Sequence, residues 1–261
     1  MSSRIVALLI TVAIATQWAN AQSTFGSIVG AVKDPGALVV AGAEVTLTGL
    51  DDNSSRHAVA DGDGAFQFMN VKAGKYQITV NAAGFADFKM PSVQLDARQT
   101  LRVDVSLKLA TTSEVIEVAD QAPVINTENA TLADTKDAVL LTQLPVNYRG
   151  ATTSPLAALV TVPGTQQDSN GNVSIGGGIP SQVQYSVDGA STVNIRQNGV
   201  LGNMNPSSEL ISEFKVAQFN NSAEFAQLGD ITITTKSGAE HFHGSAFEYL
   251  QNSALDATTY G

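Results

Sequence analysis

Two histidines spaced by one residue are the first candidates for metal chemistry. His241 and His243 stand at alternate positions of a predicted strand, so their imidazoles would share one face. A zinc site needs three or four ligands at suitable spacing, but the chain has no cysteine and only one other histidine, His57, on a predicted exposed turn. We therefore expect no bound metal and no zinc-peptidase activity.

Two glycine-rich stretches look like ligand loops but lack the residues that such loops need. Asp61-Gly62-Asp63-Gly64 begins like a calcium loop, yet the closing Glu is absent, so we interpret it as a hairpin turn. Gly176-Gly177-Gly178 is not followed by Lys-Ser/Thr, as a phosphate loop would be. Since no nucleophile-base or paired-carboxylate arrangement stands out either, we predict neither an enzyme nor a cofactor.

The N-terminus has the pattern of an export signal. Arg4 supplies the positive charge, residues 5–15 are apolar, and Ala19-Asn20-Ala21 is a small-x-small cleavage site. The apolar run is too short to span a bilayer, which takes roughly 20 residues. We expect residues 1–21 to be cleaved, which leaves 13 basic and 24 acidic groups and a net charge of −11. That charge argues against nucleic-acid binding, and an exported chain without cysteine suits a bacterial periplasmic or outer-membrane protein.

Short alternating segments dominate the part of the chain after the signal, and they predict a β-sandwich over residues 22–109. Turn residues such as Asp34-Pro35-Gly36 and Ala83-Gly84 separate them. The predicted strands are residues 25–32, 43–48, 55–60, 65–68, 76–80 and 101–107. Alternate positions of these strands hold Phe66, Phe68, Tyr76 and Ile78, which we expect to fill the core between the two sheets.

The rest of the chain has a different pattern and predicts a small α+β domain with long loops. Residues 110–135 are polar and read as a linker followed by an extended segment. Short helices are predicted at 138–144, 155–160 and 206–211, the last with Pro206 in its first turn, and strands at 183–187, 213–216 and 231–235. In residues 231–235 apolar and polar side chains alternate, which predicts one buried face.

The first domain resembles the carboxypeptidase-regulatory-like family of transthyretin-type sandwiches. The matching stretches are residues 26–34, 42–47, 61–68, 74–80 and 83–85. That family is sometimes described as carbohydrate-binding by analogy of fold. This sequence shows no aromatic platform to support glycan binding, and a fold alone does not establish function.

Residues 113–235 resemble the plug domain of TonB-dependent outer-membrane receptors of the Oar-like group. One departure is Leu228-Gly229-Asp230, where the group usually has a Gly-Gly pair. We expect the Arg149 side chain to form a structural ion pair in preference to clamping a ligand carboxylate. The residues that carry the resemblance are Leu144, Pro145, Asn147, Arg149, Asp188, Gly189, Glu213, Phe214, Glu224, Lys236, Ser237 and Gly238.

Between the two domains, residues 110–120 form a linker with a short alternating segment. This segment resembles a TonB box, which would pair with an edge strand of a TonB-type energising protein. An ordinary linker strand is the alternative, with equal weight. The residues concerned are Glu114, Val115, Ile116, Glu117 and Val118.

The predicted architecture is therefore mainly β: a transthyretin-like sandwich, a plug at residues 121–238 and, at 239–261, the first strand of an outer-membrane barrel. The resemblance implies the N-terminal fragment of a receptor in a Gram-negative outer membrane, with the present residues on its periplasmic side. Its partners would be a TonB-type protein and an extracellular solute, and we expect loops 165–182 and 191–205 to face that solute. The alternative is a free-standing periplasmic or surface binding module that interacts with carbohydrate or protein and does not transport.

Overall fold

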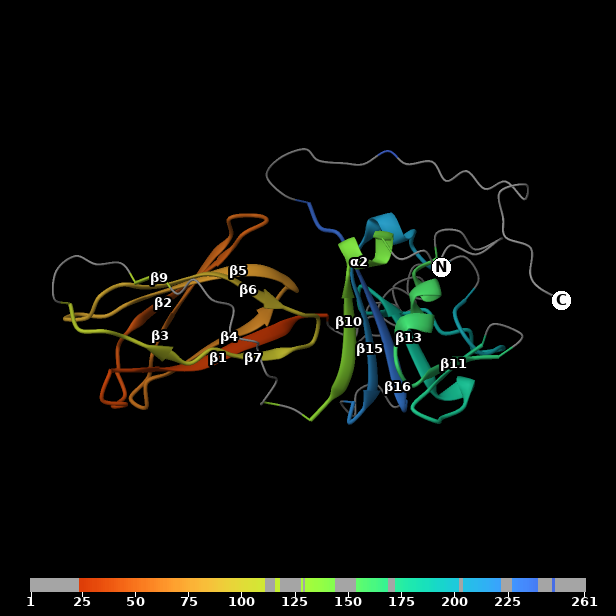
Figure 1. Ribbon diagram of the computed structural model, residues 1–261, viewed down its shortest axis with the longest axis horizontal. Helices are drawn as coiled ribbons and strands as arrows, with labels where there is room; N and C mark the ends of the chain where they lie inside the picture. Colours follow the sequence, from red (N-terminus) through yellow and green to blue (C-terminus); the bar gives the residue numbers. More distant parts are fainter. Residues whose placement is uncertain are drawn as a thin grey trace, which may run out of the picture.

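The computed structural model describes residues 24–110, 116–117, 128, 130–143, 154–168, 172–201, 204–221, 227–238 and 246. It is mainly β, as predicted, and has two separate hydrophobic cores. Figure 1 shows a β-sandwich (residues 24–110) beside a second unit built around a five-stranded mixed sheet (residues 130–238), which we call the mixed-sheet unit. The predicted export signal and nearly all of the predicted barrel segment lie outside the described residues.

The sandwich consists of two sheets packed face to face. One has the order β4-β1-β7, with β8 also pairing with β1, and the other has the order β3-β2-β5-β6-β9. The strands are β1 (Gly26–Lys33), β2 (Glu44–Gly49), β3 (Ser55–Val59), β4 (Ala65–Val71), β5 (Gly74–Asn81), β6 (Phe88–Leu95), β7 (Thr100–Arg102), β8 (Val105–Ser106) and β9 (Ile116–Glu117).

Alternate residues of these strands fill the sandwich core, as the sequence pattern predicted. Phe66, Phe68 and Ile78 are buried and Tyr76 packs at the edge of the cluster, where its hydroxyl donates to Lys72 O at 2.8 Å. The Asp61–Gly64 stretch is a turn, because the Asp61 carboxylate accepts the Asp63 and Ala65 amides.

Three details of the predicted sandwich were wrong. The predicted strand 101–107 is divided into β7 and β8, and both pair in parallel with β1. His57 lies within β3 and not on a turn, with its Nδ1 3.0 Å from Thr46 Oγ1. Strand β6 was missed because Lys89 and Pro91 interrupt its alternation; proline is tolerated there because β6 lies near the edge of its sheet.

The mixed-sheet unit has the strand order β10-β15-β16-β13-β14. Strands β16 and β13 are parallel, and the other neighbouring pairs are antiparallel. The strands are β10 (Leu132–Asp137), β13 (Val183–Val187), β14 (Ala190–Ser191), β15 (Ile211–Phe219) and β16 (Gly229–Thr235), and a separate hairpin joins β11 (Thr165–Gln167) to β12 (Val173–Ile175).

One face of the mixed sheet is apolar and packs against short helices. Phe214, Val216, Ile231 and Ile233 lie in this core together with Leu141 of α2 (Ala138–Gln143). The helix at 155–160 is a 3-10 helix, η2 (Pro155–Thr161), and two further single turns are η3 (Pro180–Gln182) and η4 (Ser208–Leu210). The helix predicted at 206–211 is only η4, so Pro206 lies outside it.

The opposite face of the mixed sheet is polar, yet it is also buried. Thr232 and Asp230 of β16 are 1% and 4% exposed, and Ser186 of the neighbouring β13 is fully buried. The expectation of a single buried face for 231–235 was therefore wrong. The reason is that the sandwich covers the polar face with the turn between β6 and β7.

Candidate functional site: the interface between the sandwich and the mixed sheet

The turn that covers the polar face is Asp96–Gln99. It is closed by Gln99 N–H, which donates to Asp96 O at 3.2 Å, and by Asp96 N–H, which donates to the Gln99 side chain at 2.8 Å. Arg98 has a φ of 57°, in the left-handed region that residues other than glycine rarely adopt. A strained residue of this kind persists only where its surroundings hold it in place.

The Arg98 side chain crosses from the sandwich to two strands of the mixed sheet. Its Nη1 donates to Asp230 Oδ2 at 2.8 Å and to Thr232 Oγ1 at 2.7 Å, and its Nη2 donates to Ser186 Oγ at 3.3 Å. The ion pair is nearly enclosed, with side-chain exposures of 10% for Arg98 and 5% for Asp230. Charge-assisted hydrogen bonds are strong when solvent is excluded, so this contact fixes both the position and the angle of the sandwich.

The neighbouring residue, Ala97, is bound through its main chain. Its N–H donates to both carboxylate oxygens of Glu213 at 3.0 Å, and its carbonyl accepts from Lys215 Nζ at 2.6 Å. Glu213 and Lys215 alternate along β15, which places both side chains on the polar face of the sheet. The mixed-sheet unit thus binds one residue of the sandwich through both its N–H and its carbonyl.

Burial shifts the pKa values of these groups. Desolvation, followed by the charge of Asp96, raises the pKa of Glu213 to about 7, although the Ala97 N–H and Lys215 oppose the shift. Burial also raises the pKa of Asp230 against the opposing effect of Arg98, and lowers that of Lys215. Glu213 is therefore a described group of this interface whose charge changes near neutral pH.

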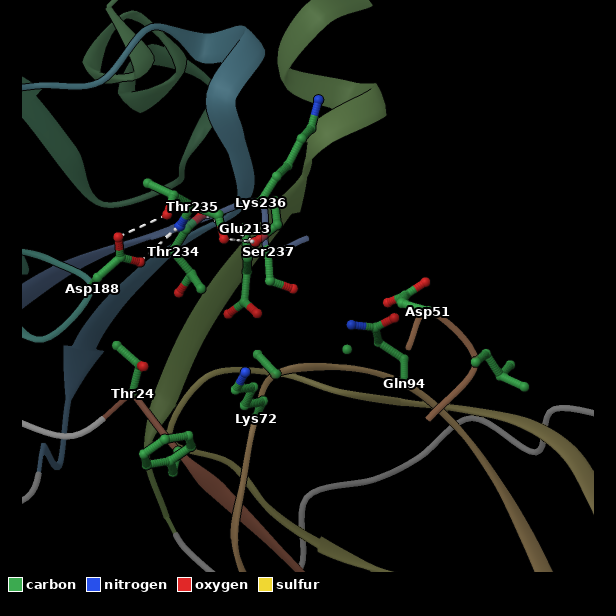
Figure 2. Close-up of a pocket in the computed structure, with 15 residues that line it drawn as sticks. Thr24, Asp51, Lys72, Gln94, Asp188, Glu213, Thr234, Thr235, Lys236 and Ser237 are labelled. Carbon is green, nitrogen blue, oxygen red and sulfur yellow. Dashed lines mark hydrogen bonds between the residues drawn. The ribbon is translucent and has the colours of Figure 1, made fainter. Parts of the chain in front are cut away.

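A cleft of about 640 Å³ lies beside this polar cluster, between the sandwich loops and the end of the mixed sheet. Lys72 and Gln94 line it from the sandwich, and Glu213 and Thr234 from the mixed sheet. In Figure 2 Lys236 points away from the other lining side chains, and its Nζ donates to Glu209 O at 2.8 Å.

The structure brings several of the residues that carry the plug resemblance to this cleft. Asp188 and Gly189 form the hairpin turn between β13 and β14, with φ values of 48° and 83°. The Asp188 carboxylate accepts Thr235 N–H at 2.9 Å and Thr235 Oγ1–H at 2.7 Å (Figure 2). Asp188, Glu213, Lys236 and Ser237 all line the cleft.

The remaining predicted site residues are elsewhere or outside the described part of the chain. Phe214 points into the apolar core, opposite to Glu213, and Gly238 follows β16 in an exposed position. Of the TonB-box-like segment, Ile116 and Glu117 form β9, which pairs in parallel with Phe88 and Lys89 of β6. The residues outside are Glu114, Val115, Val118, Leu144, Pro145, Asn147, Arg149, Glu224, His241 and His243.

Sequence reasoning missed Ala97, Arg98, Lys215 and Asp230. One signal was available, because Asp230 stands at the departure from the expected Gly-Gly pair. Gly229 keeps the close approach that such a pair implies, since a Cβ there would lie 2.9 Å from the Ile175 side chain. The acidic residue in the second position provides the partner for Arg98.

Comparison with known proteins identifies the class of the first unit. Residues 27–108 match the family model described as "Carboxypeptidase regulatory-like domain". The sandwich therefore matches the family that the sequence resemblance predicted for it.

A curated relative extends the similarity to most of the chain. The chain is 28% identical, over 249 residues, to "TonB-dependent transporter Oar" of Myxococcus xanthus. The match covers 92% of this chain and 23% of the relative, so the chain spans about a quarter of the length of the curated relative that it matches. The two findings together confirm the predicted resemblance to the N-terminal part of an Oar-like TonB-dependent receptor.

Solved structures show only distant likeness. A Streptococcal ancillary pilin is 17% identical with a TM-score of 0.28, and the match covers 33% of each chain. A putative carbohydrate binding protein from Bacteroides uniformis is 14% identical with a TM-score of 0.29, over 33% of this chain and 42% of that one.

The residues that the structure describes lack two kinds of feature. Within them, no helix is both long and apolar enough to cross a membrane. Nor do three or more His, Cys, Asp or Glu side chains in the described part gather in a way that could hold a metal ion.

Proposed function

We propose that this chain is the periplasm-facing part of a TonB-dependent outer-membrane receptor, in which the mixed-sheet unit is the plug. The observation that carries the proposal is the similarity to a TonB-dependent transporter over 92% of the chain, since it includes both units and not the sandwich alone. The chain has a binding and gating role in this proposal and no catalytic one. The plug blocks the passage of an extracellular solute until a periplasmic partner moves it.

The geometry of the mixed-sheet unit supports this assignment. Asp188, in the hairpin turn after β13, accepts two hydrogen bonds from Thr235, the last residue of β16. The next residue, Lys236, donates from its side chain to the carbonyl of Glu209 in η4. These bonds connect the stretches that carry the plug resemblance into one structure at the edge of the cleft. Through these bonds, a displacement of residues 235–238 would also move the β13–β14 turn.

In the proposed mechanism the TonB-type partner engages residues 114–118. Two of these residues, Ile116 and Glu117, form the strand β9 at the end of a sandwich sheet in the described part of the chain. A segment that pairs with an edge through its main chain can pair with the edge strand of another protein in the same way. The partner would therefore compete with β6 for this segment.

A pulldown with the periplasmic domain of a TonB-type protein tests the proposal. We expect the chain to be captured, and scrambling residues 114–118 to abolish capture. Scrambling residues 122–126, a second five-residue stretch between the sandwich and β10, is the matched control and should leave capture unchanged. Equal capture of the two scrambled variants, or no capture of the unmodified chain, would contradict the proposed role of this segment.

A further inference from the structure

We propose that the turn Asp96–Gln99 is a proton-sensitive latch, which holds the sandwich on the mixed sheet and releases it as Glu213 loses its proton. This inference rests on the interface itself and not on the proposed transport function. It concerns contacts between two parts of the same chain, so it can be tested without a partner or a ligand.

The first support is the way in which the turn is bound. Both polar main-chain groups of Ala97 and both terminal nitrogens of the Arg98 guanidinium are bonded to side chains of the mixed-sheet unit. These side chains come from β13, β15 and β16, so a single turn of the sandwich is bonded to three neighbouring strands. Because these bonds involve two adjacent residues, they can form or break together.

The second support is the backbone of the turn. Arg98 stands at a φ where glycine would be unstrained, although nothing in the turn's own hydrogen bonds requires an arginine there. Within the sandwich, Arg98 N–H donates to Thr24 O at 3.3 Å, and the guanidinium contacts with Asp230, Thr232 and Ser186 add further compensation for the strain. An undocked turn would lose this further compensation.

The third support is the balance of charge at the interface. With Glu213 protonated, the cations Arg98 and Lys215 balance the anions Asp230 and Asp96. Deprotonation of Glu213 leaves the buried cluster with one excess negative charge, which is unfavourable where solvent is excluded. Asp137 stands at the paired position of β10. The other ionisable groups that line the cleft with Glu213 are Lys72 and Asp51 of the sandwich and Asp188 and Lys236 of the mixed-sheet unit.

The direction of the pH effect follows from linkage. In the docked state the pKa of Glu213 is raised from 4.5 to about 7. Between pH 4.5 and pH 7, Glu213 is therefore protonated in the docked state and deprotonated in the undocked state. Docking is therefore favoured at low pH and weakens as the pH rises. The docking equilibrium constant should fall by up to about tenfold for each pH unit between 4.5 and 7, and level off above that range.

The absence of cysteine from the chain makes a direct measurement simple. Cysteines introduced at two exposed positions, Lys108 of the sandwich and Asn198 of the mixed-sheet unit, can carry a spectroscopic distance pair without background labelling. Amide hydrogen exchange at Ala97, corrected for its intrinsic pH dependence, gives a second readout, because this N–H is bonded to Glu213 only in the docked state.

Between pH 5 and pH 8 we expect the labelled chain to shift from a narrow distribution of label-to-label distances to a broad one, with loss of protection at Ala97. Glu213→Gln, which keeps an acceptor but cannot ionise, should remain docked at both pH values. Arg98→Gly should be undocked at both, since glycine relieves the strain but removes the guanidinium. Arg196→Ala, at an exposed loop position, is the control and should behave like the parent chain.

Two results would overturn the latch. One is an unchanged distance and unchanged protection of Ala97 in the parent chain from pH 5 to pH 8. The other is a Glu213→Gln variant that still undocks at pH 8. Because Arg98 lies on a turn outside both cores, loss of docking in Arg98→Gly with intact circular dichroism separates undocking from unfolding.

Discussion

At the scale of single residues, Asp188 illustrates how one carboxylate can join distant parts of a sequence. Its two oxygens accept the amide and the hydroxyl of Thr235, 47 positions further along the chain. Its own backbone has a φ of 48°, a conformation that Asp and Asn tolerate better than other non-glycine residues. The side chain and the backbone conformation therefore favour the same few residue types at this position.

We expect Asp188→Ala to lower the free energy of unfolding by about 1–2 kcal/mol, because the substitution removes both acceptors and places alanine at positive φ. Asp188→Asn keeps one acceptor and the tolerated backbone, so it should cost clearly less. Urea denaturation of the two variants measures the difference. Equal losses would mean that the contact with Thr235 contributes nothing beyond the turn.

Residue-level prediction from sequence succeeded where the signal was local. The pattern that identified Phe66, Phe68 and Ile78 as core residues is contained in short strands. Arg98 could not be found in this way, because its partner Asp230 is 132 positions away and the polar residues on both sides read as solvent-exposed. Only the topology shows that they meet.

At the scale of elements, β1 is the strand around which the sandwich is built. It pairs with β4 on one side and with β7 and β8 on the other. Gly30 lies in its centre, where an added Cβ would be 1.9 Å from Val103 O and 2.7 Å from the Phe66 ring. Only glycine allows the neighbouring chain to pass this closely.

Gly30→Ala should therefore lower the free energy of unfolding by about 1–3 kcal/mol, because the backbone at Val103, and not a flexible side chain, must move to make room for the added Cβ. Gly62→Ala is the matched control: a Cβ at Gly62 meets nothing within 4 Å, and we expect a change within about 0.5 kcal/mol. Thermal unfolding of both variants is the measurement. A stable Gly30→Ala variant would show that β1 and the segment around Val103 can separate.

Elements with clear alternation were predicted, and the ones that were missed had lost it for identifiable reasons. In the β11–β12 hairpin, β11 is polar, and β12 is too short for its two buried apolar residues, Val173 and Ile175, to stand out from the surrounding loop. Strand β10 carries Asp134 and Lys136 as an ion pair along one face, so it has no apolar face to reveal it. In both cases hydrogen bonding to a partner strand, and not side-chain pattern, decides the structure.

At the scale of the whole molecule, the two hydrophobic cores are connected by a polar interface. Polar interfaces between units are expected to be reversible, whereas a continuous apolar core is not. In Figure 1 the sandwich lies with one end against the mixed sheet. This arrangement explains why one titrating group can influence the relation between the two units.

The stability of the whole chain should depend on Glu213. Its pKa in the folded chain is raised to about 7 from 4.5, so its contribution is fully present below pH 4.5 and is lost as the pH rises through 7. We expect Glu213→Gln to be more stable than the parent chain at pH 8 by at most about 3 kcal/mol, with the difference shrinking towards pH 5. Urea midpoints at the two pH values measure it, and a difference that is the same at both would rule out titration as the cause.

The binding of Ala97 through its main chain has a consequence for how this interface can change in evolution. Position 97 contributes only backbone atoms to the contact, so any residue small enough to be enclosed there would serve. Arg98 and Asp230, in contrast, depend on each other, because either one alone would be a buried charge without a partner. Position 97 can therefore be substituted by other small residues without loss of the contact. Positions 98 and 230 are expected to change together. Relatives with a different docking contact should carry substitutions at both of these positions.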